Sequence, residues 1–355
     1  GNVYVIFIKY QNHIFIILIV NGLITVYLKM HLDFCTIFNH EYLSRALAMY
    51  ASLKKNCDSF HVYAYVLDDV CLRYFQTGDF PNLTILPIAV AEDAELLKVK
   101  KKRTLGEYCW TCTPSLILCT IQKYNLKHCT YVDADLYFFQ NPKILVQEMG
   151  DDSVLITPHN FSTEYKSALR FGKYCIQFMT FKNDEYAMKA LRWWREACLN
   201  WCYNRLEDGK FGDQLYLDDW LTRFEKIHEL QQEGSFAPWN NLTFDIVEEN
   251  GQKILVNKKT LRRSPLVFYH FHGFKFIEER YRIFNTYLFK IRKIDYGSFT
   301  ISKETEKALY NPYIEHLRNK SAMLKINLED DVDADGVVVY ERDFENIFKK
   351  DKSTQ

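Results

Sequence analysis

The sequence predicts an α/β protein built on a central sheet with helices packed against it. Short apolar runs that suit strands alternate with longer segments of helical periodicity, the pattern of parallel strands joined by crossover helices. The chain has 355 residues, 48% of them hydrophobic and 25% charged, which fits a large ordered domain and excludes wholesale disorder. Lys plus Arg and Asp plus Glu each total 45, so the charge balance gives no indication of a nucleic-acid partner.

The part of the chain before residue 128 is predicted to form strands and helices in alternation. Apolar, β-rich runs predict strands over residues 31–37, 60–67 and 83–86. Asn39 is the expected N-cap of a helix that continues to about Lys55. Thr113 and Pro114 read as the cap and first position of a second helix, which we expect to end after Tyr124.

The rest of the chain continues this alternation before it becomes polar. Further apolar runs predict strands over residues 129–132, 154–157, 174–181 and 266–271. Asp184 is the expected cap of a long amphipathic helix that reaches about Asn204. We therefore expect a main domain over residues 30–298 and a polar, partly helical tail over residues 299–355.

Residues 1–29 are expected to be an apolar extension of the main domain. The stretch 14–28 is interrupted only by Asn21 and Gly22, but it is shorter than the roughly 20 apolar residues that span a bilayer. No small-residue cleavage site follows it, which argues against a signal peptide. The segment is thus either an upstream extension or a weak membrane-associating element.

The chain has ten cysteines, and several, such as Cys35 and Cys129, lie in apolar runs that predict buried free thiols. Cys109 and Cys112 form a C-x-x-C pair, which supplies only two of the four ligands of a structural zinc site. The alternative is a redox pair beside a helix start, where the thiol pKa would be lowered.

Asp133 and Asp135 form the most informative motif. They directly follow the predicted strand 129–132, and ligands of open α/β sheets gather outside the carboxyl ends of strands. Two carboxylates at this spacing suit a hard divalent cation such as Mn²⁺ or Mg²⁺. Such a cation could hold a diphosphate and neutralise the charge of a leaving nucleoside diphosphate.

Two further stretches carry candidate functional residues. His270 follows a late strand and could complete a metal shell with a neutral imidazole, while Lys275 could reach phosphate oxygens. Asp213 and Gln214 have side chains that suit hydrogen bonds to sugar hydroxyls, although Asp213 could equally be a helix cap.

A second acidic motif serves as an internal comparison. Asp331, Asp333 and Asp335 resemble the start of an EF-hand loop, but the position of the bidentate glutamate is occupied by Arg342. No strand precedes them, so we interpret this stretch as a solvated acidic segment.

Several longer motifs occur in a distinctive order. They are TIFNHEYLSRALAMYASLKK, GEYCWTCTP, YVDADLYFFQNP, ITPHNF, YCIQFMTFKND, LRWWREACLNWCYNRLEDGKFGDQLYLDDW, APWNN and VFYHFHGF. Over residues 34–298 this pattern resembles bacterial-type nucleotide-diphospho-sugar transferases of the GT-A fold, nearest to glycosyltransferase family eight and its relatives. The resemblance implies a Rossmann-like mixed sheet with flanking helices and a helical C-terminal region.

The resemblance also implies a metal and donor site. Asp133, Asp135 and His270 would bind Mn²⁺, or Mg²⁺, with His272 as a less favoured substitute for His270. The metal would hold the diphosphate of the donor, for which a UDP-sugar is expected, and Lys275 would contact its phosphates.

Other positions acquire roles by the same resemblance. The loop from Thr36 to Asn39 would lie beside the nucleotide, and Asp68 or Asp69 would lie near its base or ribose. Three side chains would act at the sugars: Asp213 and Gln214 would hold the donor sugar or the acceptor, and Gln177 would approach the anomeric carbon.

The chain departs from the family pattern at two places. Lys275 follows Gly273 by two residues, whereas the family has H-x-x-G-x-x-K, which leaves the role of this lysine open. The segment YCIQFMTF stands where an Asn-x-Gly turn is more usual, so a retaining stereochemistry rests on analogy alone.

These observations predict a metal-dependent glycosyltransferase that uses a nucleotide-sugar donor and a glycan or lipid-linked acceptor. Surface-polysaccharide synthesis in the cytoplasm, with peripheral association at a membrane surface as an option, is the context that the resemblance implies. One alternative is a non-catalytic nucleotide-sugar-binding protein on the same fold. A phosphatase of the haloacid dehalogenase type is disfavoured, because Tyr137 stands where that motif has Thr or Val.

Overall fold

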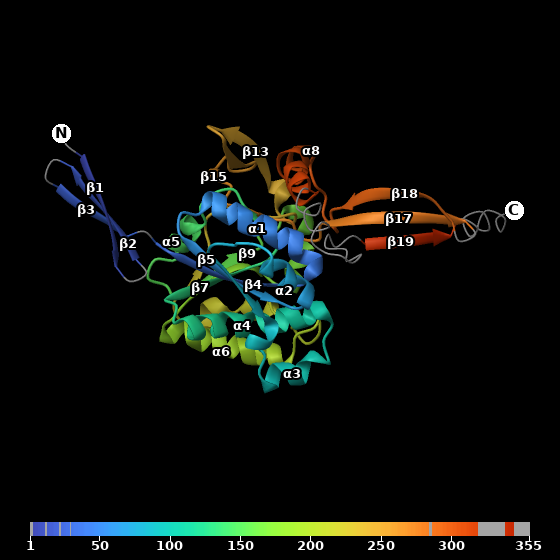
Figure 1. Cartoon of the computed structure of the whole chain (residues 1–355), viewed down its shortest axis with the longest axis horizontal. Coiled ribbons are helices and arrows are strands. Elements are labelled where there is room, and N and C mark those ends of the chain that lie inside the picture. The colour runs from blue at the N-terminus through green and yellow to red at the C-terminus, as the bar shows by residue number, and fades with distance from the viewer. Residues whose placement is uncertain are drawn as a thin grey trace.

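A mixed seven-stranded sheet forms the centre of the molecule (Figure 1). The computed structural model describes the backbone of residues 3–10, 13–20, 23–28, 30–283, 286–318 and 338–343, and the side chains of residues 30–275 and 294–318. The sheet order is β11-β9-β10-β7-β4-β5-β6. Its strands are β4 (Leu32–Phe38), β5 (Phe60–Val66), β6 (Leu83–Pro87), β7 (His128–Val132), β9 (Val154–Pro158), β10 (Tyr174–Lys182) and β11 (Ile227–Glu229).

Helices cover both faces of this sheet, which confirms the predicted α/β class with a mixed sheet and flanking helices. Strands β4, β5, β6 and β7 are parallel, whereas β10 runs antiparallel to both β7 and β9. The helices are α1 (Leu43–Asn56), α2 (Asp69–Gln76), α3 (Ala94–Lys100), α4 (Leu105–Tyr124), α5 (Lys143–Glu148), α6 (Glu185–Asn200), α7 (Trp220–Arg223) and α8 (Lys303–Thr305).

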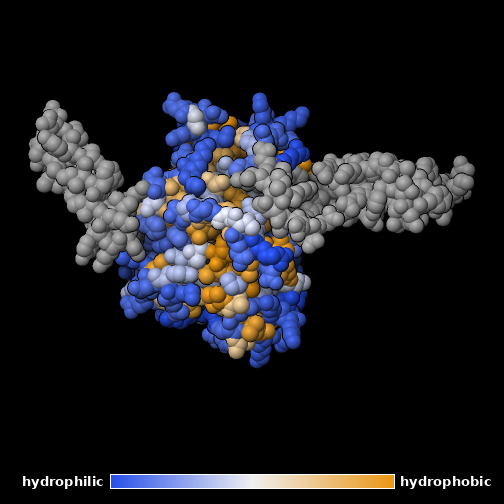
Figure 2. Space-filling model, in the orientation of Figure 1, coloured by the Kyte–Doolittle hydropathy of each residue, from blue (hydrophilic) through white to orange (hydrophobic). Residues whose placement is uncertain are grey.

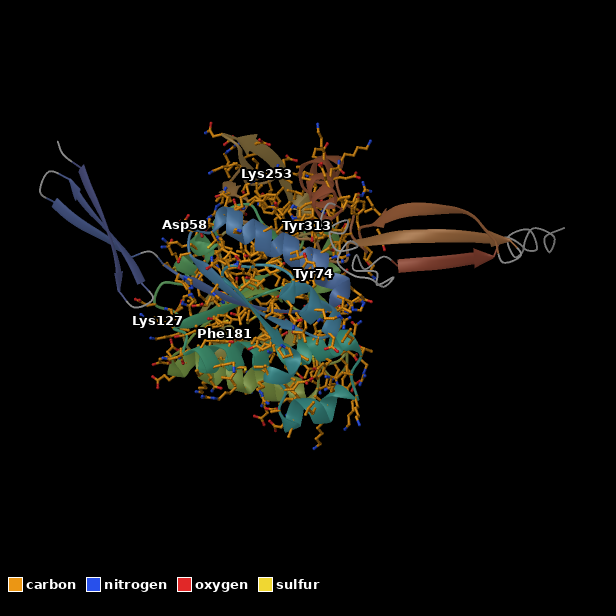
Figure 3. The ribbon with its side chains drawn as sticks, viewed as in Figure 1. Asp58, Tyr74, Lys127, Phe181, Lys253 and Tyr313 are labelled. Carbon is orange, nitrogen blue, oxygen red and sulfur yellow. The ribbon has the colours of Figure 1, made fainter. Side chains whose placement is uncertain are left out.

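Alternation of side chains along the strands produces two separate cores. In β4, Phe34 and Phe38 face the layer of α1, α2 and α5, whereas Cys35 and Ile37 face the layer of α3, α4 and α6. Phe181 of β10 belongs to the second layer, below the sheet in Figure 3. Because both faces are buried, the strands read as continuous apolar runs, which is why the sequence locates them well.

Smaller sheets extend the domain beside the central one. One contains β12 (Ser235–Phe236), β16 (Phe268–His270) and β8 (Leu136–Phe138), and another contains β13 (Phe244–Glu249), β14 (Gln252–Asn257) and β15 (Arg263–Pro265). The remaining strands are β1 (Val3–Tyr10), β2 (His13–Val20), β3 (Leu23–Leu28), β17 (Lys275–Ile283), β18 (Thr286–Asp295) and β19 (Val338–Asp343). Among the described residues, no helix combines the length and apolar content needed to cross a bilayer.

The C-terminal helical segment packs against the small sheet that carries His270. It consists of α8, a π-helical turn over Glu306–Tyr310 and further helical residues up to 318. Tyr313 of this segment, labelled in Figure 3, stacks on Phe271 with ring centroids 3.6 Å apart. Because Phe271 directly follows His270, this contact supports the end of β16 from outside the central sheet.

The expected start of α4 at Thr113 and Pro114 is wrong, because the helix begins at Leu105 and Pro114 lies inside it. A capping box sets the true start: the Glu107 N–H donates to Thr104 Oγ1 at 3.3 Å, and the Thr104 N–H donates to Glu107 Oε2 at 2.8 Å. This signal is present in the sequence and outweighs the missing N–H of the buried proline. The helix capped by Asp184 also ends earlier than expected, at Asn200.

Replacement of Thr104 by alanine is expected to lower the free energy of unfolding by about 1 kcal/mol, because the cap satisfies an otherwise unpaired N–H at the helix start. Urea titration of the full chain measures this change. Thr222→Ala is the control, since that exposed hydroxyl bonds only the Asp219 carbonyl near the end of a short helix. Equal losses in the two variants would contradict the capping explanation.

Candidate metal site

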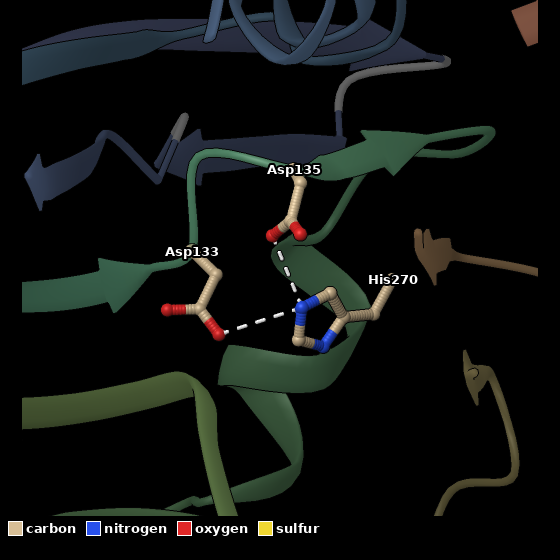
Figure 4. Close-up of side chains that lie close together, drawn as sticks. All are labelled: Asp133, Asp135 and His270. Atoms are coloured by element: carbon tan, nitrogen blue, oxygen red, sulfur yellow. Dashed lines mark ion pairs between the residues drawn. The ribbon is translucent and has the colours of Figure 1, made fainter. Parts of the chain in front are cut away.

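Three side chains converge beside the carboxyl end of β7, the middle strand of the central sheet. Asp133 and Asp135 lie in the turn between β7 and β8, and His270 is the last residue of β16. His270 Nε2 is 3.0 Å from Asp135 Oδ1 and 3.6 Å from Asp133 Oδ2 (Figure 4). One ligand atom from each residue lies within 4.8 Å of the others, which makes the group able to hold a metal ion.

Strand pairing explains why these residues meet. β8 and β16 are antiparallel, with Leu136 opposite His270, and the Phe271 N–H donates to the Asp135 carbonyl at 3.0 Å. On the other side, the Asp133 N–H donates to the Gln177 carbonyl of β10 at 3.2 Å. Both aspartates are therefore held by backbone bonds to two different strands.

Gln177 orients the ring of His270. Its Oε1 atom is 2.7 Å from His270 Nδ1, and both side chains are buried. A carbonyl oxygen only accepts, so Nδ1 carries the proton and donates it to Gln177. Nε2 is thereby left as the atom that faces the two carboxylates, the arrangement found in metal-binding histidines.

The charges of the cluster are strongly coupled. Burial alone would lower the pKa of His270, but the Asp135 and Asp133 carboxylates raise this pKa well above its ordinary value. Burial would raise the pKa of Asp135, but the charge and hydrogen bond of His270 lower it to about 2. Burial raises the pKa of Asp133 to about 6; the charge of His270 opposes this rise, and repulsion from Asp135 adds to it. Without a metal, His270 thus carries a proton on Nε2 that a cation would have to displace.

The donor set fits a divalent cation with both oxygen and nitrogen ligands. Two carboxylates suit Mg²⁺ and Mn²⁺ alike, whereas an imidazole nitrogen is a softer ligand than Mg²⁺ usually takes in proteins. The cluster contains His270 and not the exposed His272.

Asp213 lies close enough to the cluster for the charge of Asp133 to change its pKa, and Gln214 is the next residue in the chain. Asp213 is only 4% exposed, and burial together with the charge of Asp133 raises its pKa well above the ordinary value. Gln214 donates its Nε2–H to the Phe171 carbonyl at 2.8 Å. Both follow Gly212, whose φ of +53° is a backbone conformation that residues with a side chain rarely adopt.

Two of the residues expected around the nucleotide, Thr36 and Asp68, have clear surroundings within the fold. Thr36 lies within β4, and its side chain has no exposed area. Asp68 caps α2 through the Cys71 N–H at 2.9 Å and accepts from the His40 N–H at 2.7 Å. Burial would raise the pKa of Asp68, but these hydrogen bonds lower it, so the carboxylate has a structural role.

The other expected nucleotide contacts stay predictions. Asn39 is 8% exposed, and its Nδ2 lies 3.3 Å from Glu41 Oε2. Asp69, in the first turn of α2, and Lys275, at the start of β17, are exposed and free to contact a ligand. Among the described residues, no hydrogen bond or ion pair joins Asn39, Asp69 or Lys275 to the metal cluster.

Sequence reasoning missed two residues that shape the site. Arg45 is buried and donates to the carbonyls of Glu41 at 2.7 Å and Phe274 at 3.2 Å, which ties α1 to the loop after β16. Trp239 packs edge-on against His270 with ring centroids 5.3 Å apart. Trp239 stands in the APWNN motif, but neither residue has a local pattern that predicts its contact with the cluster.

The other candidate motifs do not form sites in the described residues. Cys109 and Cys112 lie inside α4, and burial raises the pKa of both thiols, to about 12 for Cys109. The redox alternative with a lowered thiol pKa at a helix start is therefore wrong. The acidic motif at Asp331, Asp333 and Asp335 lies outside the described residues.

The fold and the cluster define an α/β protein with a candidate divalent-cation site at the carboxyl end of a central strand. The chain belongs to the family of the uncharacterised protein YfnF of Bacillus subtilis (strain 168), to which it is 30% identical over 253 residues, 69% of this chain and 82% of YfnF. It is also 28% identical to the uncharacterised protein YfnD of the same organism over 291 residues, 80% of this chain and 88% of YfnD. No protein-family model matches the chain.

Similar arrangements occur among solved glycosyltransferase structures. The galactosyltransferase LgtC, in complex with donor and acceptor sugar analogues, aligns with 81% of this chain and 96% of its own at 9% identity and a TM-score of 0.49. Mouse xyloside xylosyltransferase 1 aligns with 58% of this chain and 87% of its own at 12% identity and a TM-score of 0.40. Likeness at this level does not assign an activity.

Proposed function

We propose that the protein is a metal-dependent glycosyltransferase of the GT-A type that uses a nucleotide-diphosphate sugar, expected to be a UDP-sugar. The convergence of Asp133, Asp135 and His270 at a strand end is the observation that carries this proposal. The order of motifs over residues 34–298 supports it, because the same residues are those that the family resemblance selects for metal binding.

Each residue of the cluster has a defined task in this proposal. Asp133 and Asp135 would hold the cation through carboxylate oxygens, and His270 would hold it through Nε2. The bound cation would supply the positive charge that stabilises a leaving nucleoside diphosphate. The backbone bonds of both aspartates to neighbouring strands keep these ligands in place before the substrate binds.

Residues around the cluster would position the two sugars. Asp213 and Gln214 would hold the donor sugar or the acceptor, and Lys275 would contact the phosphates. The burial of Asp213 keeps water from its carboxyl group, which strengthens any hydrogen bond it makes to a sugar hydroxyl. Asn39 and Asp69 would lie beside the nucleotide.

The wider context is also part of the proposal. The acceptor would be a glycan or a lipid-linked sugar in surface-polysaccharide synthesis, with retention of anomeric configuration by analogy only. All ten cysteines are free thiols, which fits a reducing compartment such as the cytoplasm.

A panel of nucleotide sugars, assayed with Mn²⁺ and with chelator, tests the function. The correct donor at about a hundredfold excess over its Kd is expected to stabilise the folded protein by about 2.7 kcal/mol, and only when Mn²⁺ is present. Release of the nucleoside diphosphate should follow. Tight binding without turnover would favour the non-catalytic alternative, and inhibition by fluoroberyllate would favour the phosphatase.

A further inference from the structure

The turn between α3 and α4 carries uncompensated positive charge. Residues 98–103 read KVKKKR, and Lys98, Lys101 and Lys102 are exposed and form no ion pair with any residue that the structure describes. Of the other two cations in this run, Lys100 pairs with Glu92 and Arg103 stacks on Tyr203.

Most acidic side chains around this turn contact a cation or backbone N–H groups. They are Glu92 with Lys100, Asp93 and Glu95 with Arg195, Glu107 with the N–H groups of Thr104 and Asn204, and Glu207 with Arg205. The exposed Asp208 is the acidic residue of the neighbouring loop without such a contact in the described part of the chain. Residues 92–107, residue 195 and residues 201–210 together hold eight Lys and Arg but six Asp and Glu, so this face has a local positive charge although the whole chain has none.

Exposed leucines lie among these charges. Leu97, Leu105 and Leu206 are 49%, 52% and 50% exposed, and they are three of the eight large apolar side chains exposed in the described residues. Two contacts join the segments that carry them: the Arg103 guanidinium lies 3.7 Å from the Tyr203 ring centroid, and the Asn204 N–H donates to Glu107 at 2.8 Å. We call residues 97–105 and 201–210 together the α3–α4 surface.

Partly exposed aromatic rings with cations over them complete the α3–α4 surface. Trp201 and Tyr203 lie with ring centroids 5.4 Å apart. Lys210 lies 5.5 Å from the Trp201 ring, and Arg205 lies 4.3 Å from the Tyr203 ring. Tryptophan and tyrosine favour the boundary between water and hydrocarbon, because one part of each ring system is apolar and the other hydrogen-bonds.

We propose that the α3–α4 surface docks on a bilayer that contains anionic phospholipids. The free lysines would contact phosphate headgroups, and the leucines would enter the headgroup boundary. Figure 2 shows hydrophilic and apolar residues mixed at the end of the molecule where Figure 1 places α3. A nucleic acid fits this surface less well, since it offers no apolar layer for three leucines.

A second basic tip makes a matched comparison. The turn between β14 and β15 holds Lys258, Lys259, Leu261 and Arg262, and β15 begins with Arg263; Leu261 is 72% exposed. Here three of the four cations are compensated, through pairs of Lys258 with Asp245, Arg262 with Glu233 and Arg263 with Glu249. This tip lies at the opposite end of the molecule from α3 (Figure 1), so both cannot rest on one flat membrane.

Co-sedimentation of the full chain with vesicles tests the proposal. We expect binding to vesicles of phosphatidylcholine with phosphatidylglycerol, weaker binding at high salt, and little binding to phosphatidylcholine alone. The double variant K101E/K102E is expected to lose at least about 25-fold in affinity, since each lysine at such a surface contributes about 1 kcal/mol. Leu97→Ser with Leu105→Ser should also weaken binding at constant charge.

The control variant K258E/K259E makes the same charge change at the other tip and should bind like the unchanged protein. Equal binding by K101E/K102E and the unchanged protein would overturn the proposal, as would an equal loss in the control. Thermal melts confirm that each variant is folded. Vesicle binding requires no sugar donor, so its failure leaves the proposed enzymatic function standing, and the reverse also holds.

Discussion

Replacement of Asp135 by alanine is expected to abolish high-affinity Mn²⁺ binding and to lower turnover about a thousandfold. Asp135 is the carboxylate nearest to His270 Nε2, and its pKa of about 2 keeps it ionised at neutral pH. Loss of a cation's charge at a leaving diphosphate costs several kcal/mol of transition-state stabilisation. Calorimetric titration with Mn²⁺ measures the affinity, and release of nucleoside diphosphate measures the turnover.

Asp79→Ala is the matched control, because that carboxylate is exposed in the turn before β6. It should leave both metal affinity and turnover unchanged. Undiminished Mn²⁺ affinity in Asp135→Ala would exclude this cluster as the metal site.

Asp133→Asn separates function from stability at the same site. The folded-state pKa of Asp133, about 6, lies above the ordinary value for aspartate, so ionisation destabilises the metal-free fold as pH rises between about 4 and 6. At pH 8 we therefore expect Asp133→Asn to raise the free energy of unfolding without metal, by an amount of order 1 kcal/mol. The gain should vanish below about pH 4, where both forms are uncharged, while Mn²⁺ affinity falls at neutral pH.

Gln177→Leu is expected to weaken Mn²⁺ binding by about 10- to 100-fold, although Gln177 does not face the carboxylates. The leucine cannot accept the His270 Nδ1–H, so the ring loses the bond that directs Nε2 at Asp133 and Asp135. Nitrogen NMR of His270 in the metal-loaded protein should show a mixture of tautomers in place of one.

Gln177→Glu provides the rescue, because its carboxylate also accepts from Nδ1–H. It should keep the tautomer and an Mn²⁺ affinity close to that of the unchanged protein. If Gln177→Leu and Gln177→Glu lose affinity equally, the glutamine acts through packing and not through this hydrogen bond. A role at the anomeric carbon would instead lower turnover at unchanged metal affinity.

The metal ligands could be predicted one by one because each stands at the end of an apolar strand. Asp133 and Asp135 follow β7 directly, and His270 ends β16, so local polarity marks all three. Their meeting could not be derived from spacing, because it depends on the pairing of the three-residue strand β8 with β16. A register set by so few residues leaves no hydrophobic pattern to read.

The errors have equally specific causes. Thr113 and Pro114 carry a familiar helix-start signal, but the capping box at Thr104 and Glu107 begins the helix earlier, and tertiary burial accommodates the proline. The helix capped by Asp184 ends at Asn200 and not near Asn204, where we expected it to end. For α4, one local signal, the capping box, therefore outweighed another, the Thr-Pro pair.

The amino-acid order is sufficient to define the α/β class, the positions of the central strands and the acidic pair at Asp133 and Asp135, because buried parallel strands and their polar ends are local features. The contact between Gln177 and His270 and the closeness of Asp213 to Asp133 arise only when distant strands lie side by side. Hydrogen bonds and charge coupling fall off within a few ångströms, so they exist only after the backbone has brought these residues together.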